Sequence, residues 1–141
     1  MLQFSEFVMN HWLLFLALLI ILTLFVMSSV KNKLLGYKEL KPNEVVDHMN
    51  HHDAIILDVR EDKEYLEGHV LNAIHIPLGD LNGSIEKLED YKARPLVVYC
   101  RAGQRSARAA TILQQNGFEQ VSKMSGGMLS WRSDNLPVSM E

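Results

Sequence analysis

The chain has 141 residues, which is enough for one domain of ordinary size and little more. A single cysteine excludes an internal disulfide, and a free thiol fits a reducing compartment better than an oxidising one. The formal net charge is −3, and the arginines form no extended basic stripe, so we expect no nucleic-acid partner.

The first thirty residues are almost uncharged. All fourteen Lys and Arg residues lie at or beyond Lys31, and residues 12–30, WLLFLALLIILTLFVMSSV, contain no ionisable side chain. As a helix these residues would span roughly 28 Å, close to the ~30 Å thickness of the hydrocarbon layer of a membrane. Trp12 stands at one end, where an interfacial ring is favoured. We therefore expect a transmembrane helix over 12–30 in contact with the lipid bilayer, after a short N-terminal segment over 1–11.

A signal peptide and a buried core helix are the two alternatives for this segment. Signal peptides begin with basic residues, but no Lys or Arg precedes Trp12, and residues 26–28 form a poor cleavage site. A helix that is apolar on all sides is not expected inside so small a domain. The lysines near the span all follow it, so the positive-inside rule places the C-terminal part of the chain in the cytoplasm. These lysines are Lys31, Lys33, Lys38 and Lys41.

The remaining residues alternate between short apolar runs and helical stretches, after a linker over 31–36. Within the domain over 37–141, strands are predicted over 54–59, 73–76, 96–99 and 121–124. Helices are predicted over 41–49, 63–67 and 106–116, with a helical turn over 127–132. This alternation predicts an α/β domain with a parallel sheet that helices cover on both faces. Ligands bind such sheets beyond the carboxyl ends of the strands, and Cys100 directly follows the clearest strand, LVVY.

The sequence YCRAGQRS, over 99–106, places the cysteine in a loop between that strand and a helix. Backbone N–H groups and a helix N-terminus form an anion-binding cradle there, and Gly103 permits the tight turn. Arg101 and Arg105 add positive charge, which lowers the pKa of a thiol and increases its nucleophilic thiolate fraction. The alternative is a small buried residue that only packs at the strand end. The loop and its arginines favour a reactive Cys100.

Other polar residues near the strand ends are interpreted as structural. Asp58 and Arg60 could perform acid–base chemistry, but an ion pair or hydrogen bonds that fix a loop are favoured, and Glu64 is interpreted in the same way. His69 could act as a general base, but a hydrogen bond to the backbone near a turn is favoured. A thiol with a depressed pKa needs no base.

Three histidines, at positions 48, 51 and 52, suggest a metal site, but no cysteine lies near them in the sequence. Only His48 and His52 have the spacing that places two side chains on one face of a helix. A solvated helix end is favoured, and we assign no metal. Gly126 and Gly127 are expected to allow close backbone approach, and Trp131 to anchor the packing beside the cysteine loop.

The spacing after the cysteine separates two families that use such a loop. Cysteine-dependent phosphatases share C-x5-R, whereas here the arginine comes after four residues, and Ser106 fills the next position. A smaller cradle suits a sulfur atom on the cysteine better than a tetrahedral phosphate. The loop CRAGQR resembles the six-residue active-site loop of rhodanese-like sulfurtransferases.

Two longer stretches extend this resemblance over nearly all of residues 37–138. Residues 56–78, ILDVREDKEYLEGHVLNAIHIPL, are similar to the opening signature of the family, and residues 97–131 are similar to its second half. The resemblance implies a rhodanese-like five-stranded parallel sheet flanked by helices on both faces, here preceded by one transmembrane helix. A single rhodanese domain with an N-terminal membrane anchor is a known bacterial arrangement. This implies a single-pass protein of the bacterial inner membrane with a cytoplasmic catalytic domain.

The resemblance also implies a persulfide mechanism of double displacement, with Cys100 as the catalytic residue and no cofactor. Sulfur would pass from thiosulfate or a protein persulfide to a thiol or another nucleophilic acceptor. Arg105 would close the loop and hold an anionic donor, Arg101 would steer anions from the solvent, and Asp58 and Arg60 would support the site. The loop residues expected to bind substrate are Arg101, Ala102, Gly103, Gln104, Arg105 and Ser106.

Two alternatives remain on the same fold. A cysteine-dependent phosphatase or arsenate reductase is disfavoured by the loop spacing. A non-catalytic docking module is disfavoured by the intact cysteine.

Overall fold

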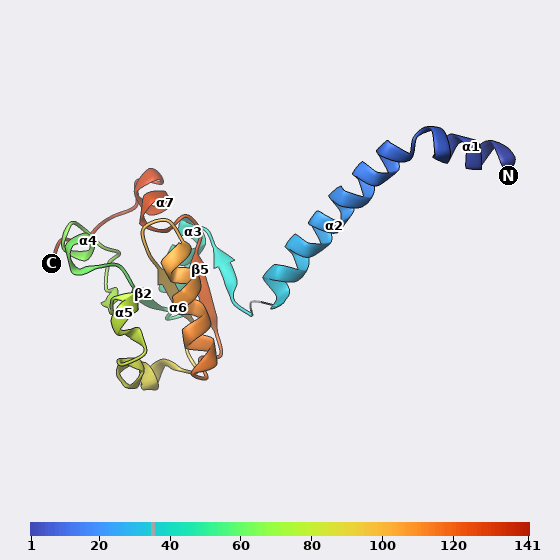
Figure 1. The fold of residues 1–141 in the computed structure, drawn as a ribbon. Coiled ribbons are helices and arrows are strands. Elements are labelled where there is room, and N and C mark those ends of the chain that lie inside the picture. Colours follow the sequence, from blue (N-terminus) through green and yellow to red (C-terminus); the bar gives the residue numbers. More distant parts are fainter. Residues whose placement is uncertain (35) are drawn as a thin grey trace. The chain divides into compact units, whose positions relative to one another are not determined.

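The computed structural model describes residues 1–34 and 36–141, which fall into two compact units, 1–35 and 36–141 (Figure 1). The first unit consists of two helices, α1 (Leu2–Asn10) and α2 (Trp12–Leu34), with the break between them at His11. Residues 12–30 of α2 have a mean hydropathy of 2.8 and none of them is buried, so this helix is a candidate membrane span. Helix α2 continues to Leu34, so the first four residues of the expected linker are helical. Residue 35 of that linker lies outside the described residues.

The second unit contains a five-stranded sheet in the order β1-β5-β4-β2-β3, and all neighbouring strands are parallel. This confirms the fold that the resemblance implied. Four strands coincide with predicted ones: β2 (Ile55–Asp58), β3 (Ile74–His75), β4 (Leu96–Tyr99) and β5 (Val121–Met124). The fifth, β1 (Lys38–Leu40), is an edge strand with only Leu40 buried, so its sequence shows no apolar run.

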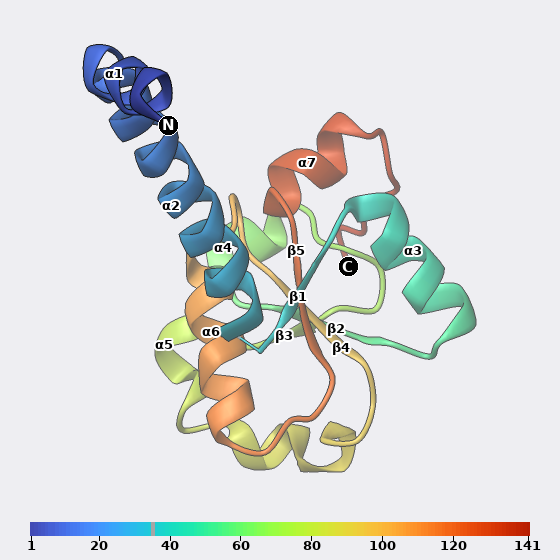
Figure 2. The same ribbon diagram turned by 90° about the vertical axis from the view of Figure 1, so that its right-hand side faces the viewer.

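Helices cover both faces of the sheet (Figure 2). One face carries α5 (Leu78–Leu81) and α6 (Gln104–Gln115), and the other carries α3 (Pro42–His51) and α7 (Gly127–Ser133). Neither α5 nor the 3-10 helix η1 (Ile85–Tyr91) was predicted from the sequence. The remaining helix, α4 (Asp62–Leu66), follows β2 and lies one residue earlier than predicted.

Side chains of β4 alternate between two apolar clusters, as expected for a central strand that is buried on both faces. Leu96 and Val98 pack in the cluster that contains Leu113 of α6. Val97 and Tyr99 pack in the cluster that contains Trp131 of α7. Because β4 is enclosed in this way, the residue that follows it has a fixed position at the carboxyl edge of the sheet. That residue is Cys100.

Candidate active site

The loop that begins with Cys100 connects β4 to α6 in four residues, 100–103. Gly103 immediately precedes the helix and has a φ of +121°, a conformation that residues with a side chain rarely adopt. Helix α6 begins at Gln104, two residues earlier than predicted, so Arg105 and Ser106 belong to its first turn. The side chains of Arg101, Ala102 and Gln104 are exposed.

The sulfur of Cys100 lies inside this loop and is 1% exposed. It accepts a hydrogen bond from the backbone N–H of Gly103 at 3.0 Å, and it lies 3.5 Å from the hydroxyl oxygen of Ser106. Burial is the largest single influence on this thiol, and burial alone would raise its pKa. Hydrogen bonds from the loop outweigh it, and the pKa of the Cys100 thiol is held below its ordinary value. The donors are the Ser106 hydroxyl and the backbone N–H groups of Ser106, Gly103 and Ala102.

The hydroxyl of Ser106 has one proton and two possible acceptors. It donates to the carbonyl oxygen of Gly103 at 3.0 Å, while the protonated Cys100 thiol donates to the Ser106 oxygen. When the thiol ionises, the hydroxyl can turn and donate to the sulfur instead. Ser106 is fully buried, so water does not compete for the hydrogen bonds of its hydroxyl group. This hydroxyl can therefore satisfy both protonation states of Cys100.

The carbonyl groups of the loop are bound by helix α7. The N–H of Met128 donates to the Cys100 oxygen at 2.8 Å, and the N–H of Leu129 donates to the Arg101 oxygen at 3.1 Å. This contact requires a glycine, because a Cβ on Gly127 would lie 2.4 Å from the Cys100 oxygen. The close backbone approach that was predicted for Gly126 and Gly127 is thus confirmed for Gly127, whereas a Cβ on Gly126 would meet the side chain of Ser130. Trp131, 1% exposed, anchors α7. With these carbonyls held by α7, loop N–H groups can point at the sulfur.

Lys123 supports the same loop, although its sequence context did not predict this role. Its ammonium group donates to the Gly103 oxygen at 3.3 Å and pairs with the Glu39 carboxylate at 3.0 Å. The two residues are register partners on β5 and β1. The sequence offered one hint of this role, a lysine within a strand that was otherwise predicted to be buried. Its partner could not be predicted because β1 itself was not predicted.

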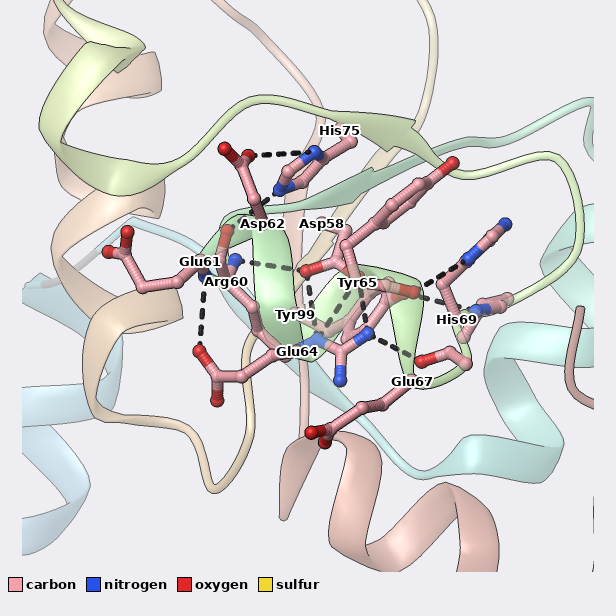
Figure 3. A network of polar contacts seen from close by, with 12 residues as sticks. Asp58, Arg60, Glu61, Asp62, Glu64, Tyr65, Glu67, His69, His75 and Tyr99 are labelled. Carbon is pink, nitrogen blue, oxygen red and sulfur yellow. Dashed lines mark hydrogen bonds and ion pairs between the residues drawn. The ribbon is translucent and has the colours of Figure 1, made fainter. Parts of the chain in front are cut away.

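Asp58 and Arg60 form a buried ion pair at the end of β2 (Figure 3). The guanidinium donates to both carboxylate oxygens and also, at 2.8 Å, to the carbonyl oxygen of Gly68. The Tyr99 hydroxyl donates to Asp58 at 2.6 Å and accepts the N–H of Val70 at 3.0 Å. This network ties the ends of β2 and β4 to the segment after α4. Asp58 and Arg60 thus form the ion pair and the loop-fixing hydrogen bonds that the sequence favoured.

Arg105 was expected to close the loop, but the structure pairs it with Glu64 of α4. Two terminal nitrogens of the guanidinium donate to the two carboxylate oxygens at 2.6 and 2.8 Å. The hydrogen bonds from Arg105 are the main reason why the pKa of Glu64 is lowered to about 2. Glu64 therefore has a larger part in the site than the sequence suggested.

A cleft of about 150 Å³ lies beside the loop. Its walls include Arg101, Glu64 and Glu67, together with Leu129 and Arg132 of α7. Arg132 donates to the carbonyl oxygen of Glu67 at 3.1 Å. Among the described residues, Arg101 has neither a hydrogen bond nor an ion pair through its side chain, so its charge is available to an incoming anion.

His69, His51 and His52 have contact partners other than the Cys100 sulfur. His69 is buried, bonds through Nδ1 to the carbonyl oxygen of Tyr65 at 3.0 Å and stacks on the Tyr65 ring at 3.8 Å. This confirms the backbone contact that the sequence favoured for His69. At the end of α3, His51 and His52 lie 3.7 and 3.9 Å from the Asp47 carboxylate, and both are largely exposed.

Known proteins resemble the second unit in sequence and in fold. The family model described as Rhodanese-like domain matches residues 41–134. Thiosulfate sulfurtransferase GlpE of Coxiella burnetii is 33% identical over 97 residues, covering 69% of this chain and 89% of that protein. A tRNA uridine(34) hydroxylase of Cronobacter sakazakii is 34% identical over 107 residues, covering 70% of this chain but only 31% of the hydroxylase. The crystal structure of a rhodanese-related protein from Thermoplasma volcanium matches with a TM-score of 0.68 at 30% identity, covering 74% of this chain and 100% of that one.

Gly127→Ala is expected to destabilise the domain by about 3 kcal/mol, because it combines a left-handed backbone with an overlap of the new Cβ and the loop carbonyls. Denaturant unfolding of the full chain in detergent measures the change. Gly79→Ala is the matched control, because a Cβ at Gly79 meets no atom within 4 Å. Equal stability of the two variants would show that α7 does not hold the loop as described.

Proposed function

The chain belongs to the rhodanese-like domain family, and we propose that it carries sulfane sulfur as a persulfide on Cys100. One observation supports this proposal most directly: the sulfur of Cys100 is buried within the loop and accepts a hydrogen bond from the Gly103 N–H. An ionised sulfur held by backbone N–H groups is a nucleophile that is already in place. The loop residues Arg101 to Ser106 form the binding site, and Asp58 and Arg60 support it.

In the first half-reaction, the Cys100 thiolate attacks the outer sulfur of the donor. A bond forms between Sγ and that sulfur, and the donor bond to the same sulfur breaks. The leaving group departs with the electron pair, as sulfite from thiosulfate or as a thiolate from a persulfide. The product is Cys100–S–S⁻, and the total charge is unchanged. Loop N–H groups stabilise the negative charge on the outer sulfur without having to reorient.

In the second half-reaction, an acceptor thiolate attacks the outer sulfur of the Cys100 persulfide. The bond between the two sulfurs breaks, and its electron pair returns to Cys100 as the thiolate. The acceptor leaves as a persulfide, so the cycle needs no external oxidant or reductant. No metal or cofactor is required for either step.

Both alternative functions are less well supported. A phosphatase would need a cradle for three phosphate oxygens, whereas this loop has one residue fewer before its arginine, and that arginine is bound to Glu64. A docking module would not need a thiol with a lowered pKa. The relatives named sulfurtransferases favour the transferase.

Incubation of the full chain with a sulfane-sulfur donor should add about 32 Da to Cys100, because one sulfur atom is transferred. Mass spectrometry of the intact protein measures the adduct, cyanide should remove it, and Cys100→Ser should abolish it. Absence of the adduct with every sulfane donor, while the thiol still reacts with iodoacetamide, would contradict the proposal. Hydrolysis of an aryl phosphate that depends on Cys100 would support the phosphatase instead.

We also propose that α2 anchors the protein in the bacterial inner membrane, with the catalytic domain in the cytoplasm. The support is the 19-residue apolar stretch over 12–30 and the lysines that directly follow it. A helix satisfies its own backbone hydrogen bonds, which is the requirement for crossing lipid as a single segment.

The anchor predicts that the protein remains in the membrane fraction after a high-salt wash and retains residues 1–30. In intact spheroplasts the domain should resist added protease, and it should be digested once the membrane is permeabilised. An intact mass that lacks the N-terminal segment would indicate a cleaved signal peptide. Digestion of the domain in intact spheroplasts would reverse the proposed orientation.

A further inference from the structure

The pair between Glu64 and Arg105 occupies the loop arginine before any donor arrives. Both terminal nitrogens of the guanidinium are directed at the carboxylate, and the two side chains are only 24% and 31% exposed. The residues come from different elements, α4 and α6, and are separated by 41 positions in the sequence. The fork of N–H donors that recognises oxyanions is therefore already filled by an internal carboxylate.

Glu64 is held in this position from a second side. Its Oε2 atom also accepts the backbone N–H of Glu61 at 3.1 Å, as the dashed line in Figure 3 shows. The carboxylate therefore has bonds to both α4 and the loop arginine. An oxyanion that enters the cleft must either displace Glu64 from the two terminal nitrogens of Arg105 or bind only to the N–H groups that Glu64 leaves free.

Some of the charged side chains around the cleft are neutralised by an ion pair, and the others are free to interact with a donor. Arg60 is neutralised by Asp58, and Arg105 is neutralised by Glu64. Arg101 and Arg132 carry the positive charge that remains on the cleft wall, and Glu67 carries a negative one. The Cys100 thiolate adds a further negative charge within the loop. A dianion would meet little net attraction in this arrangement.

We infer that Glu64 determines donor specificity, by disfavouring dianionic donors such as thiosulfate and leaving persulfides of organic thiols, R–S–SH, as the preferred substrate class. This inference rests on the proposed persulfide transfer at Cys100. The chemistry differs between the two donors only in the group that leaves. Cys100–S⁻ and R–S–SH give Cys100–S–SH and R–S⁻, so the donor brings at most one negative charge to the sulfur. Thiosulfate brings two charges and releases a dianion, sulfite.

The experiment compares Glu64→Gln with Glu67→Gln in the full chain, purified in detergent. Both substitutions remove one negative charge from the cleft wall, but only the first frees Arg105. Glu64→Gln should lower the KM for thiosulfate and the inhibition constant of sulfate by about tenfold, because one full charge near the loop is no longer cancelled. The KM for the persulfide of 2-mercaptoethanol, which carries no charge besides that of its persulfide group, should change by less than about twofold. Glu67→Gln removes an exposed, screened charge and frees no guanidinium, so it should lower the thiosulfate and sulfate constants by only about twofold.

The double variant Glu64→Gln/Arg105→Gln identifies the group responsible. It should lose the gain in sulfate affinity, since the freed guanidinium is no longer present. Unchanged thiosulfate and sulfate constants in Glu64→Gln would overturn the inference, and so would a gain that persists in the double variant. If Glu64→Gln fails to fold, Glu64→Asp loosens the same pair and should shift the same constants in the same direction. No shift in that variant would also overturn the inference.

Failure of this inference is distinct from failure of the proposed function. If Cys100 accepts sulfur from both donors but the Glu64 variants keep the wild-type constants, only the specificity role is wrong. If Cys100 accepts sulfur from neither donor, persulfide transfer itself is wrong.

Discussion

The hydrogen bond from the Gly103 N–H to the Cys100 sulfur is the interaction on which the rest of the site depends. A thiol that is 1% exposed would normally resist ionisation, so loop donors must compensate for the lost hydration. That compensation is possible only if the loop carbonyls are satisfied elsewhere, and helix α7 binds two of them. The positive φ of Gly103 and the close approach of Gly127 are therefore parts of one arrangement that directs N–H groups at the sulfur.

The polar network at the end of β2 gives this arrangement a rigid base. Asp58 accepts hydrogen bonds from Arg60 and Tyr99, and Tyr99 directly precedes the cysteine. Removing one member would leave a buried charge uncompensated, which typically costs about 3–5 kcal/mol. The network therefore positions Cys100 through the backbone of β4, without any contact with the sulfur. Arg105 and Glu64 form a separate ion pair between α6 and α4, and we infer that this pair sets the charge that an incoming donor meets.

Local patterns in the sequence predicted the central strands, the position of Cys100 and the helix after it, because each depends on neighbouring residues. The apolar run of β4 and the glycine in the loop could be interpreted without knowledge of the fold. Strand β1 was missed because only one of its three residues is buried. The contacts of Lys123 with Glu39 and of Arg105 with Glu64 were also missed. These depend on strand register and on segments far apart in the chain, which one sequence does not encode locally.

The most direct test of the account is the pH dependence of alkylation of the single thiol, in the folded chain and in denaturant. Because the loop stabilises the thiolate, the half-maximal rate should occur at a lower pH in the folded protein, and Ser106→Ala should move it upward. Because the fold lowers the pKa of Cys100, the loop contacts of the thiolate add to the free energy of unfolding at pH values above the pKa of the unfolded chain. This contribution is lost as the pH falls through the pKa of the folded protein. Equal midpoints in the folded and denatured chain would contradict the central claim.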